Sequence, residues 1–268
     1  MKPQQQKNII SLPGSKAYLC FWPGQFMYIG QAADTSIHDH HAIQLIISFD
    51  EPIEIELPGS LLKVNAAIID SDQPHQCKTF NNRFLLMNIA PESDIGITLR
   101  NHFLSDQNIR ELPASRTSEF IEEVSEALAE GADKDPIYTI TQKFLHSLSD
   151  TPELISMDDR IIKVIKLLNQ PHEETISIKG LSDQVFLSPS RLIHLFTKQV
   201  GIPIRKYILW LKLLTALQKA IETENMTEAA LHGGFSDAPH FNRTFKRMFG
   251  LNPTSLLKNS RIVQANRE

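Results

Sequence analysis

The sequence has few cysteines and no long apolar run. Its 268 residues include two cysteines, Cys20 and Cys77, which are too few for a disulfide scaffold and lack metal-ligand spacing. No window approaches the roughly 18 to 20 consecutive apolar residues that a membrane span requires. Residues 1–14 lack the apolar stretch and small-residue cleavage site of an export signal. We therefore expect a cytoplasmic protein with no membrane partner.

Charge is unevenly distributed along the chain. From Asp158 onward there are 16 Lys and Arg against 10 Asp and Glu, whereas the residues before it carry 11 and 21. A basic half beside an acidic half favours contact of one half with a polyanion, although two ordinary solvated surfaces would give the same counts. The length itself predicts two domains, because a compact domain typically has about 100 to 150 residues.

The N-terminal part is predicted to be an all-β barrel or sandwich. Short apolar segments, several of them alternating, are separated by turn residues such as Pro58-Gly59. The expected strands cover 17–22, 26–30, 42–48, 53–57, 64–69 and 84–89. We place this barrel at about residues 15–105.

Two helices are expected at about 115–150, one from Ser118 to Gly131 and one from Pro136 to Leu148. Ser118 is a candidate N-cap and Gly131 a candidate C-cap. The first helix has an apolar stripe at four-residue steps, Phe120, Val124 and Leu128. The stripe could cover the barrel of its own chain or pair with a second copy in a homodimer, and the sequence does not separate these options. Barrel and helices together form the first expected domain, residues 1–150.

After a linker at about 150–157, the chain predicts an all-α second domain, residues 158–268. Its most informative feature is a repeat at an offset of 49 residues. The segments 181–204 and 230–253 pair Phe186 with Phe235, Leu192 with Phe241, Phe196 with Phe245 and Gly201 with Gly250. A long helix from about Pro203 to Glu222 separates the two copies.

Each copy has two helices joined by a tight turn, which is the helix-turn-helix arrangement that places a second helix in the major groove. Ser188 and Asp237 are the expected N-caps of the second helices. Leu192, Leu195 and Phe196 in one copy, and Phe241, Phe245, Met248 and Phe249 in the other, should face inward. The candidate DNA-binding residues are Ser190, Ile193, His194, Thr197, Lys198, Pro239, His240, Asn242, Arg243, Lys246 and Arg247.

Residues 176–256 resemble the AraC-type (AraC/XylS) transcription regulators. The second unit, Gly234-Phe235-Ser236-Asp237-x-x-His240-Phe241-x-Arg243-x-Phe245-Lys246-x-x-x-Gly250-x-x-Pro253, follows that family's signature. The first unit, Ser188-Pro189-Ser190-Arg191-Leu192-x-x-Leu195-Phe196, is also similar. The resemblance implies that both recognition helices enter adjacent major grooves of double-stranded DNA, with RNA polymerase as a further candidate partner. Lys212, Pro239 and Leu256-Leu257 depart from the usual pattern.

The segment His38-Asp39-His40-His41, followed later by Gln73-Pro74-His75, resembles a cupin barrel. Three imidazoles converging in such a barrel would suit a transition metal, but the glutamate usual in cupin enzymes is absent. AraC-type regulators often carry a cupin-like domain that binds a small effector without metal. Effector pocket, structural histidines and metal site all stay open.

We predict a DNA-binding regulator that responds to a small-molecule effector, with no catalytic residue, cofactor or metal assigned. His38, His40, His75 and Trp22 are the candidate effector-binding residues, with Phe26 another possible lining residue. The alternative function is a metal-dependent cupin enzyme with an accessory helical domain. We find no other catalytic motif above chance.

Overall fold

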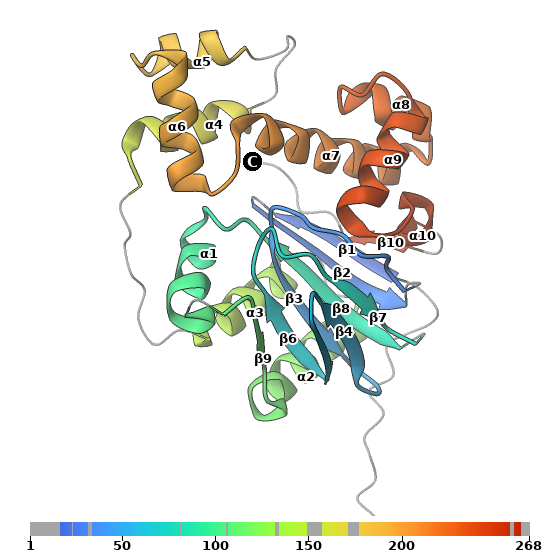
Figure 1. Ribbon diagram of the computed structural model, residues 1–268. Coiled ribbons are helices and arrows are strands. Elements are labelled where there is room, and N and C mark those ends of the chain that lie inside the picture. Colours follow the sequence, from blue (N-terminus) through green and yellow to red (C-terminus); the bar gives the residue numbers. More distant parts are fainter. Residues whose placement is uncertain are drawn as a thin grey trace, which may run out of the picture. The chain divides into compact units, whose positions relative to one another are not determined.

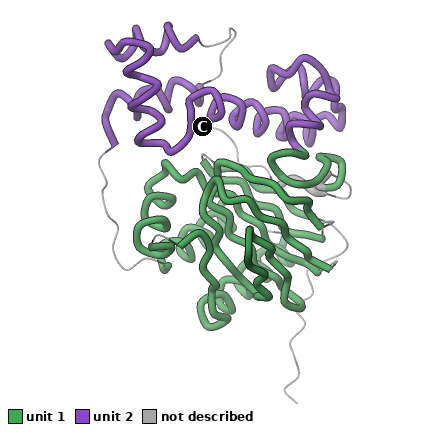
Figure 2. The backbone as a smooth tube through the Cα atoms, viewed as in Figure 1, with its two compact units in different colours: residues 1–152, 246–268 green, residues 153–245 purple. Residues whose placement is uncertain are grey.

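The computed structural model describes residues 17–22, 24–31, 34–80, 82–105, 107–131, 134–148, 157–170, 177–257 and 260–263. The chain forms two compact units, one of residues 1–152 with 246–268 and one of residues 153–245 (Figure 2). The first division, after Pro152, falls within the predicted linker, most of which lies outside the described residues. The sequence does not predict the second division, after Phe245, which groups the C-terminal residues with the first unit.

Unit 1 contains two β-sheets rather than one closed barrel (Figure 1). The seven-stranded sheet has the order β10-β1-β2-β8-β3-β6-β9, and the three-stranded sheet has the order β5-β4-β7. The strands are β1 (Ala17–Trp22), β2 (Gln25–Gln31), β3 (Ile43–Ser48), β4 (Ile53–Leu57), β5 (Ser60–Val64), β6 (Ala66–Ile69), β7 (Gln76–Lys78), β8 (Arg83–Ile89), β9 (Ile109–Glu111) and β10 (Ser260–Val263). The prediction that this region is rich in β-strands is confirmed, whereas the sheets do not close into a single barrel.

One expected strand, 64–69, is two strands in different sheets. Val64 pairs with Ile53 in the three-stranded sheet, whereas Ala66 pairs with Ile47 in the seven-stranded sheet. Between them the carbonyl of Asn65 accepts a hydrogen bond from Ser48 N at 2.7 Å. The chain therefore crosses from one sheet to the other at Asn65, a step that the apolar pattern alone does not reveal.

Unit 1 also contains helices α1 (Asp94–Thr98), α2 (Ala114–Ala129), α3 (Lys134–Ser147) and α10 (Pro253–Leu257), and the π-helix η1 (Leu99–Leu104). The prediction missed α1 and η1, which fall in the stretch assigned to the barrel. The predicted N-cap at Ser118 is wrong, because α2 begins one turn earlier and Pro113 occupies that position. Gly131 follows the C-cap Glu130 and has a φ of +72°, which a glycine adopts without strain.

The apolar stripe of α2 packs within its own chain. Phe120, Val124 and Leu128 are buried in a cluster that joins the seven-stranded sheet to the helices. The Phe120 ring stacks on Phe144 of α3 with centroids 4.1 Å apart. Of the two options left open by the sequence, covering the sheet is confirmed, and pairing of this stripe across a dimer axis is wrong.

The described residues of unit 2 form helices and connecting turns, as predicted, whereas the expected all-α segment 158–268 also contributes the strand β10 to unit 1. It contains α4 (Asp159–Leu168), α5 (Ile178–Gln184), α6 (Pro189–Val200), α7 (Ile204–Thr223), α8 (Met226–His232) and most of α9 (Ala238–Phe249). A core of apolar side chains from α4, α5, α6 and the start of α7 holds the first half together. Among the described residues, no helix is both long and apolar enough to span a bilayer.

Candidate functional site: two recognition helices and a histidine cluster

The repeat forms two helix pairs at opposite ends of α7 (Figure 1). Helices α5 and α6 make the first pair, and α8 and α9 make the second. Ser188 is the N-cap of α6, and its side chain accepts a hydrogen bond from Arg191 N at 3.3 Å. Asp237 accepts one from His240 N at 2.6 Å at the start of α9, and this bond lowers the pKa of its carboxyl. Both predicted caps are confirmed.

The two recognition helices each have one buried and one exposed face. On α6, Leu192, Leu195 and Phe196 are buried, and Phe241, Phe245 and Phe249 are buried on α9. The opposite face of α6 forms one shallow concave surface lined by Ser190, Ile193, His194, Thr197 and Lys198. On α9, Pro239, His240, Arg243, Lys246 and Arg247 are exposed, and Asn242 is partly buried. The structure therefore brings the predicted residues together on one face of each helix.

Residues paired by the 49-residue offset have similar conformations at the end of the repeat and different environments at its beginning. Gly201 and Gly250 both end a recognition helix in the left-handed region, with φ of +95° and +71°. Phe235, however, is buried, whereas Phe186 is 94% exposed and has a φ of +54°. The repeat predicted that Phe186 and Phe235 occupy equivalent positions. In the first copy, however, Val185 is the buried residue of the turn, and Phe186 is on the surface.

Helix α7 separates the two helix pairs and packs closely on the second. Its 20 residues span about 30 Å at 1.5 Å per residue. A Cβ added at Gly233 would lie 2.5 Å from the Cβ of Ala216 in α7, so only glycine fits there. Lys212, which departs from the resembling family's usual arginine, donates to the carbonyl of Gly234 at 3.3 Å. It thus ties α7 to the second turn.

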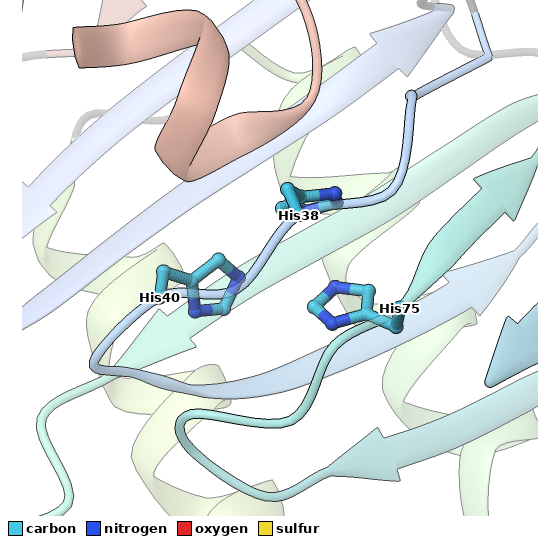
Figure 3. Close-up of side chains that lie close together, drawn as sticks. All are labelled: His38, His40 and His75. Atoms are coloured by element: carbon cyan, nitrogen blue, oxygen red, sulfur yellow. The ribbon is translucent and has the colours of Figure 1, made fainter. Parts of the chain in front are cut away.

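In unit 1, the rings of His38, His40 and His75 lie together (Figure 3). His38 and His75 are paired backbone to backbone, each N–H donating to the other's carbonyl at 2.9 Å. The three residues are buried, and one potential ligand atom of each lies within 4.8 Å of the others. His41 is not part of this cluster, because its Nε2 is 3.1 Å from Glu92 Oε2.

Burial decides the protonation of the cluster. It lowers the pKa of His38 to about 4, with a further contribution from the charge on nearby His40. It also lowers the pKa of His40, and that of His75 well below its ordinary value. For His41, burial lowers the pKa, but hydrogen bonds from its ring to the carboxylates of Asp72 and Glu92 outweigh this effect and raise the pKa overall. The three clustered imidazoles are therefore neutral near pH 7.

A small cavity of about 30 Å³ lies beside His38, between the two sheets. Its lining includes polar Gln44, as well as Phe26 and Cys77. Phe249 and Leu251, which belong to the same unit, complete it. Trp22 lies elsewhere: its ring packs on Tyr138 at 5.6 Å, in the cluster that joins the sheet to the helices. The sequence missed Gln44 and Cys77 as neighbours of the histidines because nothing local marks their direction.

Comparisons with known proteins agree with this geometry. A family model described as "Helix-turn-helix domain" matches residues 181–259. The "Probable transcriptional regulator LumQ" of Photobacterium leiognathi is 24% identical over 229 residues, which cover 81% of this chain and 90% of that protein. The "HTH-type transcriptional activator RhaS" of Pectobacterium atrosepticum is 33% identical over 91 residues, 33% of this chain and 32% of that protein.

Residues 181–259 therefore form an AraC-type helix-turn-helix domain, and the chain is related to bacterial transcription regulators.

The solved structures extend the similarity of this AraC-type regulator to its N-terminal unit at the level of fold. ToxT from Vibrio cholerae O395 superposes with a TM-score of 0.59 at 10% identity, covering 89% of this chain and 98% of that one. A second ToxT structure, with bound unsaturated fatty acid, has a TM-score of 0.52 at 9% identity and covers 91% and 95% of the two chains. The predicted domain order, a sheet-rich domain followed by a helical helix-turn-helix domain, is therefore confirmed.

Proposed function

We propose that this AraC-type regulator reads promoter DNA with α6 and α9 in adjacent major grooves, and that unit 1 binds a small effector beside its histidine cluster. The proposal for DNA binding rests on α6 and α9, two capped helices at the ends of α7 whose exposed faces are rich in hydrogen-bond donors. Adjacent grooves on one face of B-DNA are about 34 Å apart, close to the roughly 30 Å length of α7. RNA polymerase and a second copy of the chain stay predicted partners.

The exposed residues are assigned to two kinds of contact. Asn242 and Arg243 have the donors that suit adenine and guanine edges, whereas Ile193 can contact only a thymine methyl group. Lys198, Lys246 and Arg247 are near the C-terminal ends of their helices, and we assign them to phosphates. Ser190, His194, Thr197, Pro239 and His240 complete the two contacting faces.

Replacement of Arg243 tests base reading. We expect Arg243→Ala to weaken binding to an operator selected from random DNA by about 5- to 150-fold, equivalent to about 1 to 3 kcal/mol. Its side chain is exposed, so the unfolding free energy should stay within about 0.5 kcal/mol of the parent value. Fluorescence anisotropy with the selected operator and with a scrambled duplex measures both specific and nonspecific affinity.

Arg160→Ala is the matched control for charge. Arg160 is on α4, outside both recognition helices, and its guanidinium already pairs with Asp158 at 2.6 Å. This variant removes the same charge and should bind the operator as the parent does. Equal operator affinity of Arg243→Ala and the parent would contradict the base-reading role.

Replacement of Lys198 tests phosphate contact. A lysine that neutralises one phosphate releases about one counterion, so Lys198→Ala should reduce the slope of log affinity against log salt by about one unit. The loss should be the same for operator and scrambled DNA. Lys166→Ala, an exposed lysine on α4, is the control and should leave the slope unchanged. An unaltered slope for Lys198→Ala argues against the phosphate contact.

The effector proposal rests on the buried polar groups of unit 1. His38, His40 and His75 are the proposed effector-binding residues, and the packing of Trp22 on Tyr138 makes Trp22 a support of the sheet. The adjacent cavity of about 30 Å³ has room for only one or two water molecules. A ligand as large as the fatty acid in ToxT would therefore require extensive movement of the lining residues, whereas a single ion needs only small side-chain shifts.

A further inference from the structure

The strongest unexplained feature of the molecule is the arrangement of ring nitrogens in the histidine cluster. His38 Nδ1 is 2.9 Å from the carbonyl oxygen of Ser36, and His75 Nδ1 is 2.8 Å from that of Gln73. Because a carbonyl oxygen only accepts, each Nδ1 carries the hydrogen and donates it. In the neutral ring this leaves Nε2 with a lone pair.

His40 is held in the same way by a side chain. Its Nε2 is 2.9 Å from Gln44 Oε1, and the amide nitrogen of Gln44 is directed to Cys77 Sγ at 3.8 Å. The amide oxygen therefore faces His40, and His40 Nε2 donates to it. A hydrogen bond from one ring nitrogen to an oxygen acceptor is the usual way in which proteins orient an imidazole that binds a metal through its other nitrogen.

A buried lone pair without a partner is costly, and the cluster contains one. His75 is 1% exposed, and its Nε2 makes no hydrogen bond to any described residue. Leaving such a buried group unsatisfied destabilises the folded chain. The convergence of His75 Nε2 with ligand atoms of His38 and His40, all within 4.8 Å, offers a common partner that would satisfy it.

We propose that His38, His40 and His75 bind one divalent transition-metal ion. This names the ligand of the effector site and so rests on that part of the proposed function, but it does not depend on DNA binding. Three ligand nitrogens at about 2.1 Å from one ion lie about 3.4 Å apart in tetrahedral geometry, so side-chain shifts of about 1 Å complete the site. Three protein ligands leave a position for water or a small molecule.

The donor set selects the kind of ion. Three imidazoles with no carboxylate suit Zn²⁺, Ni²⁺, Co²⁺, Cu²⁺ or Fe²⁺, whereas Mg²⁺ and Ca²⁺ require oxygen ligands. His41, next in sequence, is not available because Glu92 and Asp72 engage it. We therefore expect Co²⁺ and Zn²⁺ to bind and Mg²⁺ not to compete with them.

The experiment titrates the full chain, freed of metal by chelator and dialysis, with Co²⁺ and then with Zn²⁺. We expect one equivalent of Co²⁺ to give the visible d–d bands of a nitrogen-bound ion, and Zn²⁺ to displace it. Failure of the folded parent chain to bind Co²⁺ would overturn the proposal. An intense thiolate-to-cobalt band would also overturn it, because a cysteine would then hold the ion.

Variants assign the ligands. His75→Ala should weaken binding by at least about 100-fold, and Gln44→Leu, which removes the acceptor for His40 together with the weak contact to Cys77, by about 10- to 100-fold. His146→Ala, an exposed histidine on α3, is the control and should bind as the parent does. Circular dichroism checks that each variant is folded. If His75→Ala does not fold, His38→Gln takes its place, and parent-like affinity in a folded ligand variant would contradict the site.

Arg243→Ala separates this inference from DNA binding. That variant should hold the ion with parent affinity while losing operator affinity. A parent chain that binds operator but no metal would overturn the metal site alone, whereas a chain that binds metal but no DNA would overturn the DNA-binding proposal alone.

Discussion

Truncation of Phe196 to alanine should lower the free energy of unfolding of unit 2 by about 3 to 5 kcal/mol. Its ring is fully buried in the core of the first helix pair and packs edge to face on Tyr207, with centroids 5.4 Å apart. The substitution removes these contacts and leaves a cavity that α6 and α7 cannot close without moving. Urea denaturation measures the change.

The design of this measurement uses the two tryptophans. Trp22 is in unit 1 and Trp210 is in unit 2, where it is buried. In a Trp22→Phe background, fluorescence therefore reports unit 2 alone. Ile193→Ala, one turn earlier on the exposed face of α6 and 42% exposed, is the control and should change stability by no more than about 0.5 kcal/mol. Similar losses for both variants would mean that the faces of α6 are assigned wrongly.

Replacement of Gly233 by valine should destabilise unit 2 by about 3 kcal/mol, through overpacking. The new Cβ would lie 2.5 Å from Ala216 Cβ and 2.7 Å from the carbonyl oxygen of Lys212. Both obstacles belong to the backbone or to a rigid methyl group, so no rotamer change relieves them and α8 must move away from α7. The same urea titration followed by Trp210 fluorescence measures the effect.

The neighbouring Gly234 is the matched control. It has a φ of +74°, and an added Cβ would meet only the flexible side chain of Lys212, at 3.3 Å. Gly234→Ala should therefore cost about 1 kcal/mol, the strain of a left-handed residue. If Gly233→Val were as mild as Gly234→Ala, the close approach of α7 and α8 would not limit residue 233.

The sequence predicted the features that depend on local order. Short apolar segments bounded by turn residues, several of them alternating, placed most of the expected strands within one or two residues of their observed ends. Helical periodicity and the caps Ser188 and Asp237 placed α6 and α9, and the same periodicity decided which face of each helix is exposed. The prediction failed locally at Ser118, since a polar residue within the first turn resembles a cap.

Other features depend on which distant segments meet. The sequence could not decide whether the α2 stripe faces the sheet or a second chain, because an apolar face is the same in both cases. It could not show that Phe186 is exposed while Phe235 is buried, since the neighbouring Val185 takes the core position only in the folded turn. Nor could it show that Gly233 is required by contact with α7, 17 residues earlier at Ala216.

By itself, the sequence determined the helix-turn-helix repeat that is typical of a transcription regulator, because periodicity, caps and a repeated signature are local and survive without tertiary contacts. Only the tertiary structure decided which residues the histidines contact. The backbone pairing of His38 with His75 brings together rings that are 37 residues apart, while His41, next to His40, turns to Glu92. The cupin resemblance predicted that the three rings converge, but their hydrogen-bond partners and the turning away of His41 depend on long-range packing, which no local pattern of residues encodes.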